Sequence, residues 1–248
     1  MTDLTITQIE AATFTAWPAI TTAMDGMWLA RFARGFTKRS NSIQCLDPRD
    51  DGDAVERLWR MADLYPLNSV DPLFRVTPLT GPRIIPALDA EGWVPFEESR
   101  VLTMSLGDEL AMPEGIEVLD GTDDRYFDAF AEIAGHNRRT RETLATIVNL
   151  IATRNAGILI RDAAGQPIAA ALAINALGIG IYTNVITRQD RRGEGIGRRL
   201  MQGALAWTRE VGATHAAIQV VSDNTPAVNL YTSLGFAEAY RYHYRRPR

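Results

Sequence analysis

The sequence contains a single cysteine, Cys45, and only three histidines in 248 residues. One cysteine excludes an intramolecular disulfide, and because no histidine lies near it in sequence we expect a buried thiol rather than a nucleophile. Nowhere do histidine, cysteine and carboxylate residues gather with the spacing of metal ligands, so no metal is expected. A disulfide-stapled scaffold and a zinc-dependent enzyme are therefore excluded as classes.

The sequence also lacks long apolar runs and an excess of basic residues. No stretch of about 18 apolar residues could span a membrane, and the opening MTDLTITQIE has neither the basic nor the apolar part of a signal peptide. The formal net charge of −4 argues against a polyanion-binding protein. We expect a cytoplasmic monomer or homodimer with no membrane or nucleic-acid partner. The tail YRYHYRRPR has the period of a strand, and we interpret it as an edge strand with one wet face.

An acidic stretch divides the chain. Residues 107–124 hold seven acidic residues and no lysine or arginine, which predicts a join between two units, 1–110 and 111–248. In the second unit helical and strand patterns alternate, which indicates an α/β protein with a mixed sheet. The expected helices lie at 122–135, 139–153, 196–211 and just after 224, and the expected strands at 157–162, 168–175, 179–186, 215–221 and 236–244.

The first unit is a fainter copy of this order. Both units end in a helix, a glycine, an aromatic residue and a strand. If Gly92 is aligned with Gly235, aromatic residues follow both glycines, and Leu88 stands opposite Tyr231. We interpret this as a divergent internal duplication. The first unit's expected helices lie at 7–20, 53–64 and 83–90, and its expected strands at 28–33, 42–46, 73–79 and from 93 onward.

Residues 191–200 read RRGEGIGRRL and lie between an expected strand and an expected helix. Amides at a helix N-terminus lack intrahelical partners, glycine lets a ligand approach the backbone, and the arginines add positive charge. The segment therefore predicts a site for a phosphorylated ligand. The alternative is a tight turn that only packs the helix on its strand. The spacing G-x-G-x-G fits neither a dinucleotide fingerprint nor a nucleoside-triphosphate loop.

Two motifs resemble those of the GNAT superfamily of acyl-CoA-dependent N-acetyltransferases. Residues 192–197 fit the family's R/Q-x-x-G-x-G/A loop, and residues 224–236 fit its N-x-x-A-x-x-[LF]-Y-x-x-[LM]-G-F run. The resemblance covers residues 116–248, the whole second unit. It implies a tandem GNAT acyl-CoA N-acyltransferase fold with an active second unit, and acetyl-CoA as the cosubstrate.

The resemblance also implies roles for individual residues. Tyr231 would act as the general acid that protonates the departing thiolate, a step worth about 10²–10⁴ in rate. The amide of Val185 would bind the acetyl carbonyl oxygen, on which negative charge develops. Asn224 is expected to cap its helix, with a further cofactor contact implied by the family. The residues assigned to the pantetheine arm are Val185, Ile186 and Thr187. The amides assigned to the pyrophosphate are those of Arg192, Gly193, Glu194, Gly195, Ile196, Gly197 and Arg198.

The sequence departs from the family pattern at the general base. Many relatives carry a glutamate on the strand before the loop, whereas IGIYTNVIT (179–187) has no carboxylate. Glu132 and His136 are our candidate bases, with Tyr182 or Asn184 to position a water. His215 begins a strand and is expected to be structural.

The first unit has no usable cofactor loop. Its counterpart, DPRDDGD, has four aspartates and one glycine. Acidic side chains there would repel phosphate, and Leu88 cannot donate a proton, so this half is expected to be inactive. Several of its residues are basic or aromatic, which indicates either a solvated strand and loop or an acceptor pocket for an acidic or aromatic amine. This set comprises Trp28, Arg31, Arg34, Lys38 and Arg39.

We therefore interpret the chain as an N-acetyltransferase in which a primary amine attacks acetyl-CoA directly in a ternary complex. The acceptor would be a small molecule or a peptide. The alternative is a non-catalytic acyl-CoA-binding sensor or interaction module, favoured by the missing carboxylate and opposed by the run around Tyr231. A third possibility is a nucleotide-binding oxidoreductase. It predicts tighter binding of NAD than of acetyl-CoA, which calorimetry would test.

Overall fold

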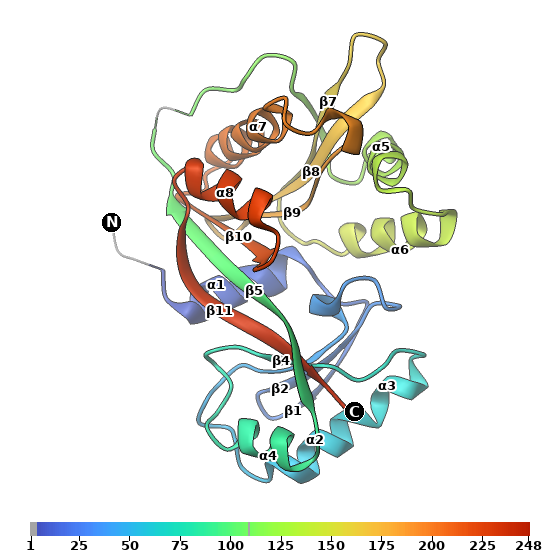
Figure 1. The fold of residues 1–248 in the computed structure, drawn as a ribbon, viewed down its shortest axis with the longest axis vertical. Helices are drawn as coiled ribbons and strands as arrows, with labels where there is room; N and C mark the ends of the chain where they lie inside the picture. The colour runs from blue at the N-terminus through green and yellow to red at the C-terminus, as the bar shows by residue number, and fades with distance from the viewer. Residues whose placement is uncertain (1–3, 109) are drawn as a thin grey trace.

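The computed structural model describes residues 4–108 and 110–248 (Figure 1). Residues 1–3, in the segment compared with a signal peptide, and Glu109, in the expected join, lie outside the described residues. The helices are α1 (Ile6–Ala16), α2 (Ala54–Ala62), α3 (Leu64–Leu67), α4 (Ile84–Ala90), α5 (Asp124–Ala134), α6 (Arg138–Asn149), α7 (Ile196–Glu210) and α8 (Thr225–Ser233). The strands are β1 (Thr21–Asp25), β2 (Trp28–Phe32), β3 (Ile43–Cys45), β4 (Phe74–Val76), β5 (Val94–Ser105), β6 (Glu117–Asp120), β7 (Asn155–Arg161), β8 (Pro167–Ala176), β9 (Ile179–Thr187), β10 (His215–Val221) and β11 (Ala237–Arg246).

One 11-stranded sheet runs through the molecule in the order β1-β2-β3-β4-β11-β5-β10-β9-β8-β7-β6. Apart from β6, the order is symmetric about the β11–β5 pair. β3 runs parallel to β4 as β9 does to β10, and β2 is antiparallel to β3 as β8 is to β9. α2 joins β3 to β4, and α7 joins β9 to β10. The duplication predicted from the two helix ends thus extends to the strand order.

The last strand of each half pairs with strands of the other half. β5 pairs with β10 and with β11, while β11 pairs with β5 and with β4. Figure 1 shows the two long strands side by side, running from one part of the molecule to the other. The sheet is therefore continuous across the expected join between 1–110 and 111–248.

The prediction that the C-terminal tail is an edge strand is wrong. The alternation itself is real, because Tyr240, Tyr242 and Tyr244 are buried while Arg241 is exposed. The strand is nevertheless paired on both sides, since its neighbours are supplied by the first half. Alternation reports which face is wet and carries no information on how many neighbours a strand has.

Helices cover both faces of the second half of the sheet. α7 and α8 pack on one face around Leu200, and α5 and α6 pack on the other around Phe127. α1 belongs to the first half in sequence but packs on β8 and β9. Its Glu10 also forms a buried ion pair with Arg75 of β4. A third core cluster fills the first half and includes the buried thiol of Cys45.

Most elements lie within a few residues of their expected positions. α1 ends at Ala16 rather than near residue 20 because Pro18 disfavours helical backbone at Trp17. β1 was not expected; it is polar and mostly exposed, so it lacks an apolar pattern. Within the described ranges, no helix combines the length and the apolarity needed to cross a bilayer.

Candidate functional site

β9 and β10 part midway along their length. They are paired in parallel only as far as Tyr182 and Ile218. Beyond these residues the described parts of the two strands make no ladder with each other. The remaining edge of β9, up to Thr187, therefore keeps backbone groups that an extended ligand can pair with.

A β-bulge lies in β9 at the start of this open edge. Ala171 of β8 faces two residues of β9, Asn184 and Val185, and Asn184 has φ +54°. Such a bulge bends the strand and takes backbone groups out of the regular ladder. It leaves Val185 at the split, where its amide can point toward a ligand.

The glycine segment forms the turn into α7. Gly193 and Gly195 have φ +86° and +76°, values that favour glycine, and a Cβ at either position would meet no described atom within 4 Å. Gly195 is the N-cap of α7 and brings no side-chain cap. The first backbone hydrogen bond at this end runs from Arg199 N to Gly195 O, so the amides of residues 193–198 donate to no described backbone group.

These amides line a groove of ≈ 390 Å³ between β9, the start of α7 and α8. Most of the residues that the sequence assigned to the coenzyme share this groove. They are Val185, Ile186, Thr187, Arg192, Gly193, Gly195, Ile196, Gly197, Arg198, Asn224 and Tyr231. Glu194 is not among the lining residues, and its carboxylate pairs with Arg191 at 2.8 Å.

Two side chains fix the walls of the groove. The Arg198 guanidinium donates to the carbonyl and the hydroxyl of Ser233, both at 3.0 Å, and so ties the start of α7 to the end of α8. Asn224 Oδ1 accepts from Ala227 N at 3.3 Å, which confirms the predicted helix cap. Arg191 is balanced by Glu194, whereas Arg192 and Arg198 leave the groove positively charged.

Tyr231 of α8 lines the groove. Its side chain is 5 % exposed, and its ring packs edge-on against Phe236 with centroids 6.1 Å apart. Burial raises its pKa to about 12, so the phenol is neutral at physiological pH. Within the described part of the chain, no group makes a hydrogen bond to its hydroxyl.

The structure does not bring the candidate bases Glu132 and His136 to the groove. Glu132 lies exposed on α5. The His136 ring packs edge-on against Phe130 and Phe36, at 5.3 and 5.9 Å, and burial lowers its pKa. A base role for either residue stays a prediction.

The other polar residues named from the sequence have structural partners. The Tyr182 hydroxyl lies 2.5 Å from the Thr208 hydroxyl inside the core, so it is not free to position a water. Asn184 reaches the Tyr126 hydroxyl at 3.4 Å. His215 Nδ1 lies 3.0 Å from the Thr214 hydroxyl at the start of β10.

In the first half the counterpart of the glycine loop is residues 47–53, and its aspartates bond to neighbouring groups of that half. Asp50 accepts from Met27 N at 2.6 Å and pairs with Arg57 at 2.7 Å. Asp51 accepts from Arg83 N at 3.0 Å. The acidic side chains of this segment are thus bonded within the first half, and its inactivity stays a prediction.

The ends of the two halves share an equivalent backbone hydrogen bond at the aligned positions. Trp93 N donates to Leu88 O at 2.8 Å, and Phe236 N donates to Tyr231 O at 3.1 Å. Leu88 therefore occupies the place of Tyr231 in the first half, fully buried and without a proton to donate.

The basic and aromatic set of the first half divides in three, and one member, Arg34, is simply exposed. Trp28 and Arg31 are buried and bonded to backbone carbonyls, so they are structural. Lys38 and Arg39 line a separate cavity with Glu97 of β5. No sequence pattern points to Glu97, since its partner Lys38 lies 59 residues away. Across residues 4–108 and 110–248, no group of three or more histidine, cysteine or carboxylate side chains could hold a metal ion.

Comparison with known proteins identifies relatives over the full chain. A family model described as "Probable histone acetyltransferase Rv0428c C-terminal" matches residues 4–245. An uncharacterized N-acetyltransferase of Bacillus subtilis (strain 168), YobR, is 23 % identical over 97 % of this chain and 98 % of its own.

Solved structures share the architecture. A GCN5-related N-acetyltransferase from Kribbella flavida superposes with a TM-score of 0.73 at 19 % identity, covering 99 % of this chain and 96 % of that one. A tandem GNAT protein from the clavulanic acid biosynthesis pathway gives a TM-score of 0.62 at 15 % identity, covering 95 % and 86 %. These likenesses establish a tandem acyltransferase fold.

Proposed function

This chain belongs to the Rv0428c C-terminal acetyltransferase family and is a GNAT-type acetyltransferase, and from this premise we propose that it transfers the acetyl group of acetyl-CoA to a primary amine. One observation carries the proposal. Backbone amides without described partners, an open strand edge and a neutral phenol meet in a single groove. Each matches a different part of acetyl-CoA: its phosphates, its extended arm and its sulfur.

The groove binds the coenzyme through main-chain groups. The amides of residues 193–198 stand at the positive end of α7 and donate to phosphate oxygens. The edge of β9 from Val185 to Thr187 pairs with the amides of the pantetheine arm as it would with an added strand. Arg192 and Arg198 add attraction for the negative charge. When bound in this way, acetyl-CoA supplies an activated thioester.

Two groups of the chain act on the reacting atoms. The Val185 amide donates to the acetyl carbonyl oxygen, where negative charge grows as the amine attacks. Tyr231 keeps its proton because burial holds its pKa at about 12. The neutral amine forms the N–C bond, and the Tyr231 hydroxyl donates to the sulfur as the C–S bond breaks, so that its proton ends on the thiol. The nitrogen loses one proton to solvent, and the phenolate takes one back from solvent. No covalent link to the protein is required.

The proposal is tested by thiol release from acetyl-CoA with a panel of amines, including small amines, amino acids and a lysine-containing histone peptide. Tyr231→Phe should lower kcat by about 10²–10⁴ and leave the affinity for acetyl-CoA unchanged. Tyr182→Phe is the matched control, because its hydroxyl bonds to Thr208 inside the core; it should change stability and leave kcat in place.

Two results would change the account. A wild-type protein that binds acetyl-CoA but releases no thiol with any amine would indicate a non-catalytic sensor. An unchanged kcat in Tyr231→Phe would remove the phenol from the mechanism and leave the coenzyme site in place.

A further inference from the structure

A second cavity, of ≈ 240 Å³, lies beside the β9–β10 split. Part of its wall is formed by Gln219, Val220 and Val221, the residues of β10 beyond the point where it leaves β9. Gln219 donates to Thr13 of α1 at 3.1 Å, which places the cavity on the face opposite α7 and α8. The coenzyme groove and this cavity therefore approach the split from opposite sides of the sheet.

We propose, resting on the acetyltransferase function above, that this cavity is the acceptor site and that it takes a small amine carrying an anionic group, held by Arg39. Its remaining walls come from loop 37–39 of the first half and from β5 and β11. The inactive half would thus supply substrate recognition to the active one.

Arg39 lies at the mouth of the split. Its Nη2 donates to the Thr183 hydroxyl of β9 at 3.1 Å, one residue beyond the last β9–β10 pair. Its main chain is fixed, because the Arg39 carbonyl accepts from Arg31 at 2.8 Å and from Gln44 at 3.1 Å. The guanidinium is therefore held beside the split of β9 and β10, and one of its five donors is used by Thr183, which leaves four for a ligand.

The positive charge of Arg39 has no counter-ion in the described structure. Of the neighbouring cations, Lys38 pairs with Glu97 at 2.8 Å and Arg75 pairs with Glu10. No carboxylate of residues 4–108 or 110–248 comes within 4.0 Å of Arg39. A half-buried, unpaired guanidinium favours an anion, and its planar fork fits a carboxylate or a phosphate.

Tyr242, in the wall of the cavity, is affected by the same positive charges. Although burial raises the pKa of Tyr242, the charges of Arg75 and Arg39 hold it below its usual value. The lining contains two cations, Lys38 and Arg39, against one carboxylate, Glu97, so the cavity is a poor environment for a polycationic segment such as a lysine-rich tail. Its volume is below the about 300–1,000 Å³ typical of pockets for drug-sized ligands, which favours a small acceptor.

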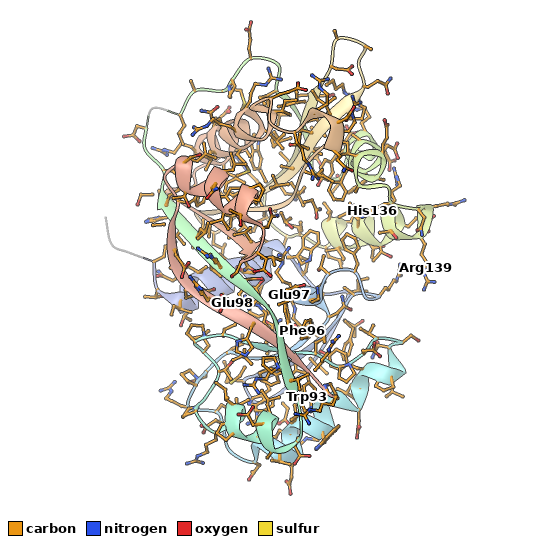
Figure 2. The ribbon with its side chains drawn as sticks, viewed as in Figure 1. Trp93, Phe96, Glu97, Glu98, His136 and Arg139 are labelled. Carbon is orange, nitrogen blue, oxygen red and sulfur yellow. The ribbon has the colours of Figure 1, made fainter. Side chains whose placement is uncertain are left out.

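Glu97 provides the complementary charge for an ammonium. It is the extra residue of a bulge in β5 opposite His243 and Tyr244, with φ +46°, a strained value for glutamate. Its partner Lys38 is the only lysine in the sequence. An acceptor amine would dock at Glu97 by taking the place of the Lys38 ammonium, which now pairs with it at 2.8 Å. Figure 2 shows Glu97 where β5 passes between the halves, apart from His136.

The test uses acceptors that differ only in the anion. One pair is phenylalanine and phenethylamine, which probes a carboxylate; the other is O-phosphoethanolamine and ethanolamine, which probes a phosphate. A lysine-rich peptide is the third arm. Each probe is assayed for thiol release with acetyl-CoA and titrated by calorimetry into the CoA-saturated protein. At least one anionic member should bind about ten-fold to a hundred-fold more tightly than its partner.

Substitutions assign the preference to Arg39. Arg39→Gln should remove the preference within each pair, Arg39→Lys should restore part of it, and both should bind acetyl-CoA like the parent. Arg34→Gln, on the same loop but exposed, is the matched control and should change nothing. Equal binding within both pairs, no binding of any anionic member, or a preference for the peptide would overturn the inference. Loss of acetyl-CoA binding by the parent protein would instead overturn the proposed function.

Discussion

Replacing Gly195 by alanine should weaken coenzyme binding at least about ten-fold while the protein stays folded. Gly195 has φ +76°, caps α7 and lines the groove. An added Cβ would meet no described atom within 4 Å, so the free protein has room for it. The methyl would instead occupy the space that a phosphate needs to reach the loop amides.

The effects on folding and on binding are of similar size in free energy, and separate measurements distinguish them. Left-handed backbone costs a non-glycine residue about 1–2 kcal/mol, which lowers the Tm of a chain of this length by about 2–8 °C. Loss of one hydrogen bond to a charged phosphate costs about 1.5–3 kcal/mol of binding free energy. At a factor of ten per about 1.4 kcal/mol, Kd for acetyl-CoA should rise about 10- to 150-fold.

The control is Gly212→Ala. Gly212 follows the other end of α7 with φ +97° and lies outside the groove, so it carries the same backbone strain without touching the ligand. Calorimetry gives Kd for both variants, and thermal unfolding gives Tm. Parent-like affinity of Gly195→Ala for acetyl-CoA would show that the added methyl does not hinder the phosphate. An equal loss of affinity in Gly212→Ala would show that backbone strain alone causes the effect.

Two further predictions concern stability. Glu10→Gln should lower the free energy of unfolding in urea by about 3–5 kcal/mol, because it leaves the buried Arg75 charge uncompensated; a loss below about 1 kcal/mol would show that the pair contributes little. Burial lowers the pKa of His136 below its usual value of 6.5. As the pH falls through 6.5, the unfolded chain therefore binds more protons than the folded protein, and the free energy of unfolding decreases. His136→Leu should therefore show a shallower loss of stability between pH 7 and pH 5.5, with His243 unchanged in both proteins; identical slopes would contradict this.

The residues that line the groove could be predicted from the sequence because most of them lie in two short segments, 185–198 and 224–231. The loop amides, the glycines at positive φ and Tyr231 each lie within one short segment. A helix start after a strand and a phenol on the next helix are fixed by the chain's immediate neighbourhood. The same holds for the ends of the two halves, where Leu88 and Tyr231 form equivalent backbone bonds.

The strand exchange and the second cavity could not be predicted in this way. β11 pairs with β5, which lies more than a hundred residues earlier in the chain. A local sequence pattern carries no information on such a partner. The Arg39–Thr183 contact joins residues 144 positions apart, and no periodicity encodes it. The candidate bases Glu132 and His136 were chosen from residue type alone, and the fold sets them outside the groove.

The central claim is most directly tested by a crystal structure with acetyl-CoA bound. The account predicts the diphosphate within hydrogen-bond distance of the amides of residues 193–198, the arm along Val185–Thr187, and the sulfur next to the Tyr231 hydroxyl. Acetyl-CoA bound elsewhere, or absent from the groove at saturating concentration, would contradict it.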